Sequence, residues 1–381
     1  MKYGVALVHN TIAPYRHPLF EKLSRYLDLR VYYCSLGHSS RKWELWPRHY
    51  DYKYKILSGM LLKTSVGDLS INPSILKELF LNRPRVLVLG GYVDATMWLA
   101  FAVGKLLKIP VIYWTEGTRE PQSILGAITR PLRILFSKKS SAVLVPGKLS
   151  RNYVISLGAD TRNVFVAPNA IENELFVNAS YKYRLHNEEL KARLGYKSKV
   201  VILYVGRLHK EKGVTFLLEA FGKLKSEIDD IALVIVGYGE LYNTLHKLCQ
   251  EKKINDVVFA GAILDYKQLI EYYSMADIFV LPTLGDVWGF VINEAMACGL
   301  PVVATRASQA AQEMIRSGEN GYIVKEADSK ELYNVLKKLI HNPKRRKKMG
   351  EKSREIVIHE FNIQHIVNGF LYVINYAHKE S

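Results

Sequence analysis

Residues 285–305 read GDVWGFVINEAMACGLPVVAT and contain the ends of one helix and the strand that follows it. We expect the helix to begin at Phe290 and to end at Cys298. Gly299 is a common helix stop, and Pro301 prevents the helix from resuming. The apolar run PVVAT then predicts a buried strand. This stretch therefore predicts one helix-to-strand unit of an α/β domain.

Short apolar runs alternate with longer helical patterns along the rest of the chain. Such runs are too apolar to face water, so they predict parallel sheets with helices on both faces. The first half has strand patterns at 5–9, 29–34, 86–90, 110–115, 141–146 and 164–169, with helices near 17–27, 94–107, 122–137 and 148–157. The second half has strand patterns at 199–208, 231–239, 257–261, 278–283, 301–305 and 321–324, with helices near 213–225, 240–252, 265–273, 308–316, 328–341, 345–360 and 362–377.

The length and this restart predict two domains. The chain has 381 residues, which is more than one compact core usually holds. The stretch 170–198 is polar and charged, and we expect it to connect the two domains. Doubly wound sheets bind ligands at the carboxyl ends of their strands, so residues just after the strands are candidate site residues.

Positive charge is concentrated in the first half of the chain. Residues 1–170 hold 24 Lys+Arg against 10 Asp+Glu, whereas residues 171–381 hold 29 against 26. A basic surface favours a nucleic acid, an anionic membrane or a phosphorylated substrate, and ordinary solubility charge is the alternative. No helix-turn-helix, RNP-like or zinc pattern supports a nucleic-acid partner.

One basic and apolar stretch, ITRPLRILFSKK (128–139), is a candidate for contact with a membrane surface. Its cations are Arg130, Arg133, Lys138 and Lys139. They flank apolar residues of a predicted helix that could lie on a bilayer. The alternative is a packed helix with solvated basic ends.

The cysteines and the N-terminal residues predict a cytoplasmic protein, with the inner face of the plasma membrane as a further location. Cys34, Cys249 and Cys298 lie far apart in apolar surroundings, which favours core thiols in a reducing compartment. The opening MKYGVALVHN is too short for a signal peptide. No run of eighteen apolar residues predicts a membrane span.

The segment GRLHKEKG (206–213) is a candidate diphosphate site. Gly206 ends a strand and permits close approach of the backbone to a ligand. Arg207 and Lys212 lie near the start of a helix, which itself favours phosphate. A solvated basic loop is the alternative. VGYGE (236–240) and VVFAGAIL (257–264) also end strands in glycine, but a lone G-x-G is not a dinucleotide fingerprint.

Two acids near the quoted stretch and one in the first half are further candidates. Glu294 shares a helical face with Phe290 and with an alanine, and a carboxylate on such a face requires a hydrogen-bonding partner. A sugar or ribose diol could supply it, as could the backbone or an Arg or Lys side chain. Asp286 aligns with this face if the first turn forms. Glu116 follows the strand at 110–115, where a helix-start carboxylate is the alternative.

Taken in order, GRLHKEKG, VGYG, FAG, PTLGDVWGFVINEAMACGLPVVAT and GENGYIV resemble the C-terminal domain of retaining glycosyltransferases of family four, also called glycosyl transferases group 1. The motif match covers 203–324. The resemblance implies the GT-B fold, in which two doubly wound Rossmann-like domains face each other across a cleft. It implies an acceptor-binding domain at 1–172, a donor-binding domain at 173–360 and a C-terminal helix at 361–381 that packs back on the first domain.

The resemblance also implies residue roles. Arg207 and Lys212 match the pair that holds the donor diphosphate, and Glu294 matches the acid that hydrogen-bonds the donor ribose. Asp286 occupies the position of the acid that contacts the transferred sugar. The residues implied to line the donor are Gly206, Gly237, Tyr238, Gly239, Gly261, Ile263, Trp288, Gly289, Phe290 and Val291.

Three departures from the family pattern affect these roles. Asp286 stands where the family has Glu, so its carboxylate reaches less far toward the sugar. The segment 10–18 lacks the paired glycine of the family's first loop, and Arg16 or His17 is the candidate to approach the diphosphate instead. Glu116 follows Thr115 where the family often has a histidine. Glu116 is therefore expected to position the acceptor or to act as a base.

The function implied is transfer of a hexose-type sugar from a UDP- or GDP-linked donor to a glycan or lipid-linked acceptor in cell-surface polysaccharide or glycolipid assembly. No D-x-D motif or His/Asp cluster appears, so we expect neither a cofactor nor a divalent metal. The alternatives are a same-fold sugar-nucleotide epimerase, a non-catalytic carbohydrate binder and a nucleic-acid binder. A phosphorylase would need a pyridoxal lysine motif, which the sequence lacks. The donor, the acceptor and the oligomeric state stay open.

Overall fold

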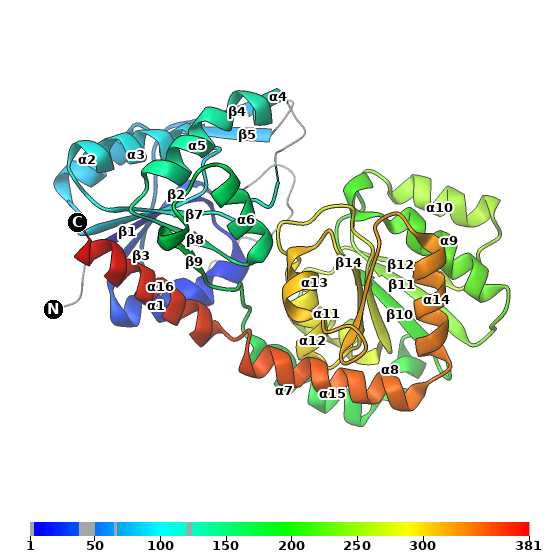
Figure 1. Ribbon diagram of the computed structural model, residues 1–381. Helices are drawn as coiled ribbons and strands as arrows, with labels where there is room; N and C mark the ends of the chain where they lie inside the picture. The colour runs from blue at the N-terminus through cyan, green and yellow to red at the C-terminus, as the bar shows by residue number, and fades with distance from the viewer. Residues whose placement is uncertain (1–3, 38–49, 65–66, 120–123, 381) are drawn as a thin grey trace. The chain divides into compact units, whose positions relative to one another are not determined.

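The computed structural model describes residues 4–37, 50–64, 67–119 and 124–380, which form two compact units (Figure 1). Unit 1 comprises Met1–Asn169 and Ile363–Ser381, and unit 2 comprises Ala170–Asn362. The chain therefore leaves unit 1 once and returns to it at its C-terminus. Within the described ranges, no helix combines the length and the apolar character needed to cross a membrane.

Unit 1 is built on a seven-stranded parallel sheet in the order β3-β2-β1-β6-β7-β8-β9. The central strands carry the continuous apolar runs that predicted them, and their side chains are buried on both faces. The strands are β1 (Gly4–Thr11), β2 (Asp28–Ser35), β3 (Lys53–Ile56), β6 (Val86–Gly90), β7 (Val111–Trp114), β8 (Ala142–Val145) and β9 (Val164–Val166). The helices are α1 (His17–Tyr26), α2 (Ser74–Leu81), α3 (Ala95–Leu106), α4 (Ile124–Ile128), α5 (Arg130–Lys139) and α6 (Lys148–Ser156).

Part of unit 1 was not predicted from the sequence. Strand β3, helix α2 and a separate antiparallel pair, β4 (Met60–Thr64) with β5 (Gly67–Ile71), lie between β2 and β6. Strand β3 lies at the edge of the sheet with exposed side chains, so it lacks the apolar run of a central strand. The single helix expected near 122–137 is interrupted at Thr129, between α4 and α5, and residues 122–123 lie outside the described residues.

Unit 2 is built on a six-stranded parallel sheet in the order β12-β11-β10-β13-β14-β15. The strands are β10 (Val200–Val205), β11 (Ile231–Val236), β12 (Val257–Gly261), β13 (Ile278–Leu281), β14 (Val302–Thr305) and β15 (Gly321–Val324). The helices are α9 (Val214–Lys225), α10 (Tyr242–Glu251), α11 (Tyr266–Met275), α12 (Phe290–Ala297), α13 (Gln309–Met314), α14 (Ser329–Ile340) and α15 (Pro343–His359). Helix α12 begins and ends as expected, with left-handed Gly289 (φ 104°) before it and Gly299 (φ 73°) after it.

Residues 170–198, which we expected to connect the two domains, are helical and belong to unit 2. They form α7 (Asn173–Leu185) and α8 (Asn187–Arg193), both part of unit 2. Both helices pack against α11, and Phe176 is buried in the core of this unit. Some of the polar residues that suggested a connection are themselves buried, among them Asn173, Ser180 and Lys191.

The C-terminal helix α16 (Ile363–Lys379) packs in unit 1, as the resemblance implied (Figure 1). It contacts α1 and strands β6 to β9. Its apolar face is buried, and the ring of Phe370 meets that of Trp114 edge to face at 4.9 Å. Residues separated by most of the chain therefore share one core.

Two glycines allow the loops at the carboxyl ends of the unit 2 strands to pack tightly. A Cβ on Gly237, after β11, would lie 1.8 Å from the carbonyl oxygen of Gly206, after β10. A Cβ on Gly213, which has φ 65°, would lie 2.1 Å from the carbonyl oxygen of Pro282, after β13. A side chain at either position would push apart two neighbouring loops.

We predict that Gly213→Ala destabilises unit 2 more than Gly195→Ala does. Gly195 is also left-handed (φ 86°), but nothing lies within 4 Å of the site of its added Cβ. The control therefore loses about 1 kcal/mol for its backbone conformation alone. Gly213→Ala should lower the free energy of unfolding by about 2–4 kcal/mol in denaturant titration, because Pro282 must also move. Equal losses would contradict the close contact.

Candidate functional site

The candidate site of unit 2 lies where the strand order of its sheet reverses. Strands β10 and β13 are neighbours, but the chain continues from β10 to β11 on one side and from β13 to β14 on the other. The chain connections after these two strands therefore run in opposite directions along the sheet. Such a switch point at the carboxyl edge is the usual ligand position in a doubly wound sheet.

Backbone and side-chain contacts join the two loops. The amide of Leu284 donates to the carbonyl of Glu211 at 2.7 Å, and the Thr283 hydroxyl donates to the same carbonyl at 3.0 Å. The Lys212 ammonium then meets the Asp286 carboxylate at 2.6 Å, with both side chains largely buried. The structure thus brings together two residues that were predicted separately, one as a diphosphate contact and one as a sugar contact.

The second predicted cation, Arg207, is half-buried on the loop after β10. Its guanidinium donates to the Glu211 carboxylate at 3.1 Å. Sequence reasoning missed Glu211, although a spacing of four residues from Arg207 is a known signal for an ion pair. A bound anion would compete with a carboxylate for each of the two cations. Within the described residues, no three His, Cys, Asp or Glu side chains form a group that could hold a metal ion.

Glu294 lies in the second turn of α12, half-buried, as its apolar helix face predicted. Its carboxylate accepts a hydrogen bond of 2.6 Å from the Tyr273 hydroxyl of α11. Burial raises the pKa of Glu294 to about 7, and the hydrogen bond from Tyr273 partly offsets this effect. The partner of the Glu294 carboxylate is thus a tyrosine hydroxyl, and not the backbone group or the Arg or Lys side chain considered from the sequence. Tyr273 was missed because its position on a neighbouring helix gives no signal along the sequence.

The predicted donor-lining residues after β10, β11 and β12 form one hydrogen-bonded edge. The amide of Leu208 donates to the carbonyl of Tyr238 at 2.7 Å. The amide of Gly237 donates to the carbonyl of Gly261 at 2.8 Å. The half-buried members of this set are Gly206, Gly237, Tyr238, Gly239, Gly261 and Ile263, and the predicted residues at the start of α12, Phe290 and Val291, are also half-buried. Neighbouring strands therefore present these residues along the same edge of the sheet.

Trp288 does not face a ligand as the resemblance implied, because its side chain is only 1% exposed. Its indole nitrogen donates to the Asn293 side chain at 2.9 Å, and its carbonyl accepts from the Ser308 hydroxyl at 2.6 Å. Trp288 therefore holds the turn before α12 in place from inside the core. The sequence alone does not show whether a large side chain beside a site motif packs in the core or contacts a ligand.

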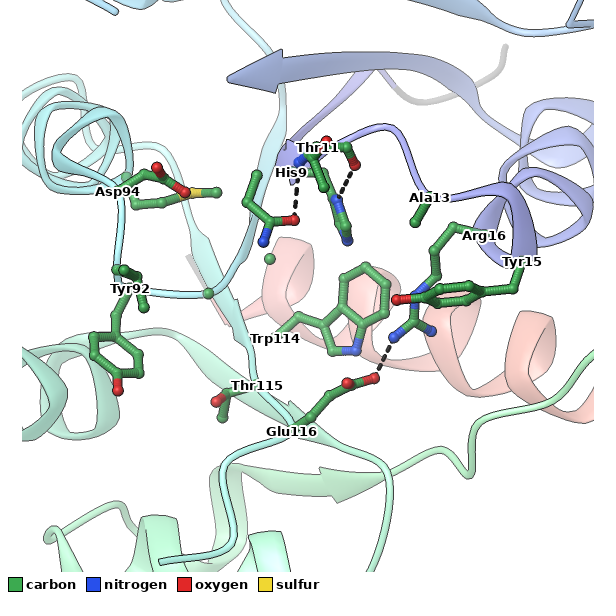
Figure 2. A pocket seen from close by; sticks show the side chains of 15 residues that line it. His9, Thr11, Ala13, Tyr15, Arg16, Tyr92, Asp94, Trp114, Thr115 and Glu116 are labelled. Atoms are coloured by element: carbon green, nitrogen blue, oxygen red, sulfur yellow. Dashed lines mark hydrogen bonds and ion pairs between the residues drawn. The ribbon is translucent and has the colours of Figure 1, made fainter. Parts of the chain in front are cut away.

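Unit 1 has a pocket of about 190 Å³ at its own switch point, between β1 and β6, and Figure 2 shows its lining. Glu116 lies at its edge and forms an ion pair with Arg16. Asn169 donates to the Glu116 carboxylate at 2.7 Å and accepts from the Arg16 guanidinium at 2.9 Å. Arg16 also lies over the Trp114 ring, with its guanidinium carbon 4.5 Å from the ring centroid. The Glu116 carboxylate is therefore held by two side chains, those of Arg16 and Asn169.

His17 is placed differently from Arg16, so only one of the two candidates for an anion contact lines the pocket. The His17 ring stacks on Tyr50 with centroids 3.7 Å apart, and its Nδ1 lies 2.6 Å from the Tyr52 hydroxyl. The His17 side chain is thus buried in an aromatic cluster. Arg16 is the residue of this pair that lines the pocket, where it is paired with Glu116 and Asn169.

Comparison with known proteins supports the interpretation of unit 2. Residues 186–356 match the family described as "Glycosyl transferases group 1". An uncharacterized glycosyltransferase of Methanocaldococcus jannaschii, MJ1069, is 28% identical over 230 residues, which are 60% of this chain and 56% of the relative. The sulfoquinovosyl transferase SQD2 of Arabidopsis thaliana is 26% identical over 298 residues, 75% of this chain and 56% of the relative. The chain thus spans little more than half the length of these relatives.

Solved structures establish the fold. Anabaena Alr3699/HepE, determined in complex with UDP, matches with a TM-score of 0.79 over 98% of this chain and 100% of that chain, at 18% identity. At this identity the likeness shows the fold alone. With the two doubly wound units and the returning C-terminal helix, the chain has the GT-B fold.

We predict that Glu294→Gln stabilises the protein at high pH. The raised pKa means that the folded chain favours the protonated carboxyl, so stability falls as pH rises from about 4.5 to about 7. The glutamine can still accept the Tyr273 hydrogen bond and removes the buried charge. The free energy of unfolding should rise by about 1–3 kcal/mol at pH 8 and change little at pH 4.

The control for this measurement is Glu319→Gln, because Glu319 is an exposed carboxylate of the same unit. It should leave the pH profile of unfolding unchanged. A Glu294→Gln profile that runs parallel to the wild-type profile would contradict the burial effect.

Proposed function

We propose that this chain, which has the GT-B fold and a group 1 glycosyltransferase domain in unit 2, transfers a sugar from a nucleotide-diphosphate donor with retention of configuration. The observation that supports this most directly is the ion pair of Lys212 with Asp286, on the loop that leads into α12, with Arg207 on the same loop as Lys212 at the switch point of the sheet. Two cations and a helix N-terminus suit a diphosphate, and a nearby acid suits sugar hydroxyls.

The donor would bind through charge-assisted hydrogen bonds. Arg207 and Lys212 would exchange their carboxylate partners for oxygens of the diphosphate. The backbone amides at the start of α12 would meet the same group. Glu294 would accept hydrogen bonds from the ribose diol, with its other oxygen held by Tyr273. Such preorganised donors, aimed at developing charge, are typically worth about 3–4 kcal/mol each.

In the reaction, the bond between the sugar C1 and the diphosphate oxygen breaks, and the nucleoside diphosphate leaves with the electron pair. The acceptor hydroxyl oxygen forms a bond to C1 from the same face. A phosphate oxygen of the donor takes the hydroxyl proton. Asp286 would hold a hydroxyl of the transferred sugar. Its side chain is one carbon shorter than the family's Glu and would affect which sugar fits.

The acceptor is proposed to use the pocket of unit 1. Glu116 would orient the acceptor hydroxyl, since Arg16 and Asn169 already fix its carboxylate. A glycan or a lipid-linked sugar fits a pocket that combines carboxylate, amide and aromatic groups. The UDP bound by Anabaena HepE supports a nucleoside-diphosphate donor, with UDP- and GDP-linked hexoses as the first candidates.

We predict that Lys212→Gln lowers kcat/KM for donor turnover by about 100- to 1000-fold, because the leaving diphosphate loses one cation. The matched control is Lys210→Gln, since Lys210 is an exposed cation two residues away on the same loop. The control should stay within a factor of about three of wild type. The measurement is release of nucleoside diphosphate, with product analysis of the sugar.

Equal effects of the two lysine substitutions would contradict a specific phosphate contact. Conversion of the donor into a different nucleotide sugar without an acceptor would instead favour the epimerase. Binding of donor without turnover, with every acceptor class offered, would favour a carbohydrate-binding relative.

We further predict that activity does not require a divalent metal, because Arg207, Lys212 and the start of α12 can meet the charge of the leaving diphosphate. Turnover should be unchanged in excess EDTA. Loss of turnover in EDTA and its recovery with magnesium would contradict this prediction, and would leave the donor-binding roles of the two cations to be tested separately.

A further inference from the structure

Tyr273 of α11 is a fully buried residue whose hydroxyl meets the carboxylate of Glu294. Its side chain is 0% exposed, and the hydroxyl donates to Oε2 of Glu294 at 2.6 Å. A buried hydroxyl costs free energy unless it is hydrogen-bonded, whereas a phenylalanine ring would fill the same space without that cost. The hydroxyl is therefore accounted for by the Glu294 carboxylate and not by packing.

Packing of the ring fixes where the Tyr273 hydroxyl lies. The ring meets that of Phe279 of β13 with centroids 5.8 Å apart, and it meets that of Phe176 of α7 edge to face at 6.5 Å. Helix α7 packs against both α11 and α12, the helix that carries Glu294. Side chains in a close-packed core are held in one arrangement. The hydrogen-bond donor to Glu294 therefore belongs to the rigid core of unit 2.

The Glu294 carboxylate can serve a ligand while it is held by Tyr273. Glu294 is half-buried, and the hydrogen bond from Tyr273 goes to Oε2. An ionised carboxylate can accept about four hydrogen bonds, so it can also accept from a ligand. Two hydroxyls on adjacent carbons can donate to one carboxylate in a bidentate manner. A vicinal diol therefore suits a glutamate that is held in this way.

Tyr273, and not a cation, favours the ionised form of Glu294. Arg184 of α7 and Arg354 of α15 donate to the Cys298 carbonyl at 2.9 and 3.2 Å, so their guanidinium groups cap the C-terminal end of α12. Burial raises the pKa of Glu294 to about 7, and the hydrogen bond from Tyr273 acts in the opposite direction. A hydrogen bond to the charged form favours that form. Tyr273 therefore helps Glu294 to remain an acceptor for hydroxyl groups.

We propose that Tyr273 is a positioning residue that holds Glu294 toward the ribose diol, so that the site selects ribonucleotides over deoxyribonucleotides. The inference rests on the proposed role of Glu294 in donor binding. Tyr273 acts through the carboxylate, because its own side chain is fully buried. A deoxyribonucleotide lacks the 2′-hydroxyl, and a site built to hydrogen-bond a hydroxyl discriminates against a ligand without it.

A tyrosine with a purely structural role leads to a different expectation. In that case its hydroxyl only satisfies the Glu294 carboxylate, and its removal lowers stability without changing which nucleotide binds. The ratio of affinities for a ribonucleotide and its 2′-deoxy form separates the two roles. Both ligands have the same base and diphosphate, so the contributions of Arg207 and Lys212 cancel in this ratio.

The test is calorimetric titration of the whole chain with UDP, GDP and ADP, each compared with its 2′-deoxy form. The nucleotide that binds the wild type should bind about 10- to 100-fold more tightly in its ribo form, as expected for a hydrogen bond to a charged group. Tyr273→Phe keeps the ring and its packing. It should weaken binding of the ribo form about tenfold and binding of the deoxy form much less, so that the ratio falls.

The matched control is Tyr333→Phe of α14, which also removes a hydrogen bond between a tyrosine and a glutamate of unit 2. Tyr333 donates to the Glu227 carboxylate at 2.7 Å, and Glu227 precedes β11, at the opposite edge of the sheet from the candidate site. The control should leave both affinities unchanged. In a Glu294→Ala chain, Tyr273→Phe should change the ratio by less than about twofold, because the two residues act as one unit.

The outcomes distinguish this inference from the proposed function. An unchanged ratio in Tyr273→Phe, or an equal fall in Tyr333→Phe, would overturn the role of Tyr273 and leave nucleotide binding in place. A fall that persists in the Glu294→Ala chain would overturn it in the same way. Failure of UDP, GDP and ADP to bind the wild type would overturn both the proposed donor and the inference that rests on it.

Discussion

The candidate site depends on close packing between the backbones of adjacent loops at the carboxyl edge of the second sheet. Gly237 and Gly213 have no room for a side chain, because each would place a Cβ against a carbonyl of a neighbouring loop. Hydrogen bonds from Leu284 and Thr283 to the Glu211 carbonyl then join the loop that carries Arg207 and Lys212 to the loop that leads into α12. The positions of these cations are therefore set by the backbone, so they can meet a ligand without reorganising the loops.

The charges of the site are balanced before any ligand binds. Lys212 is paired with Asp286 and Arg207 with Glu211, so two cations can lie close to a helix N-terminus, whose partial charge is also positive. A diphosphate would take over both partnerships and add the α12 amides. Glu294 differs, because burial raises its pKa to about 7 and leaves its carboxyl readily protonated until hydroxyl groups donate to it.

The sequence predicted those features that local patterns determine. Continuous apolar runs located most strands, and Gly289 and Gly299 marked both ends of α12. Features that depend on tertiary contacts were missed or misassigned. Helices α7 and α8 are rich in polar residues and looked like a connection. Tyr273 reaches Glu294 from another helix, and the side chains of Trp288 and Arg133 are buried in the cores of their units. A large or charged side chain near a motif can belong to the core or to the site, and only the fold distinguishes the two.

Donor binding by unit 2 is tested most directly by thermal unfolding of the chain with UDP-, GDP- and ADP-sugars. One nucleotide series should stabilise the protein, by about 2.7 kcal/mol when the ligand is at 100 times its Kd. The stabilisation should disappear in a chain that lacks both cations, Arg207→Gln with Lys212→Gln. The account is contradicted if no nucleotide sugar stabilises the chain, or if the double variant is stabilised as strongly as the wild type.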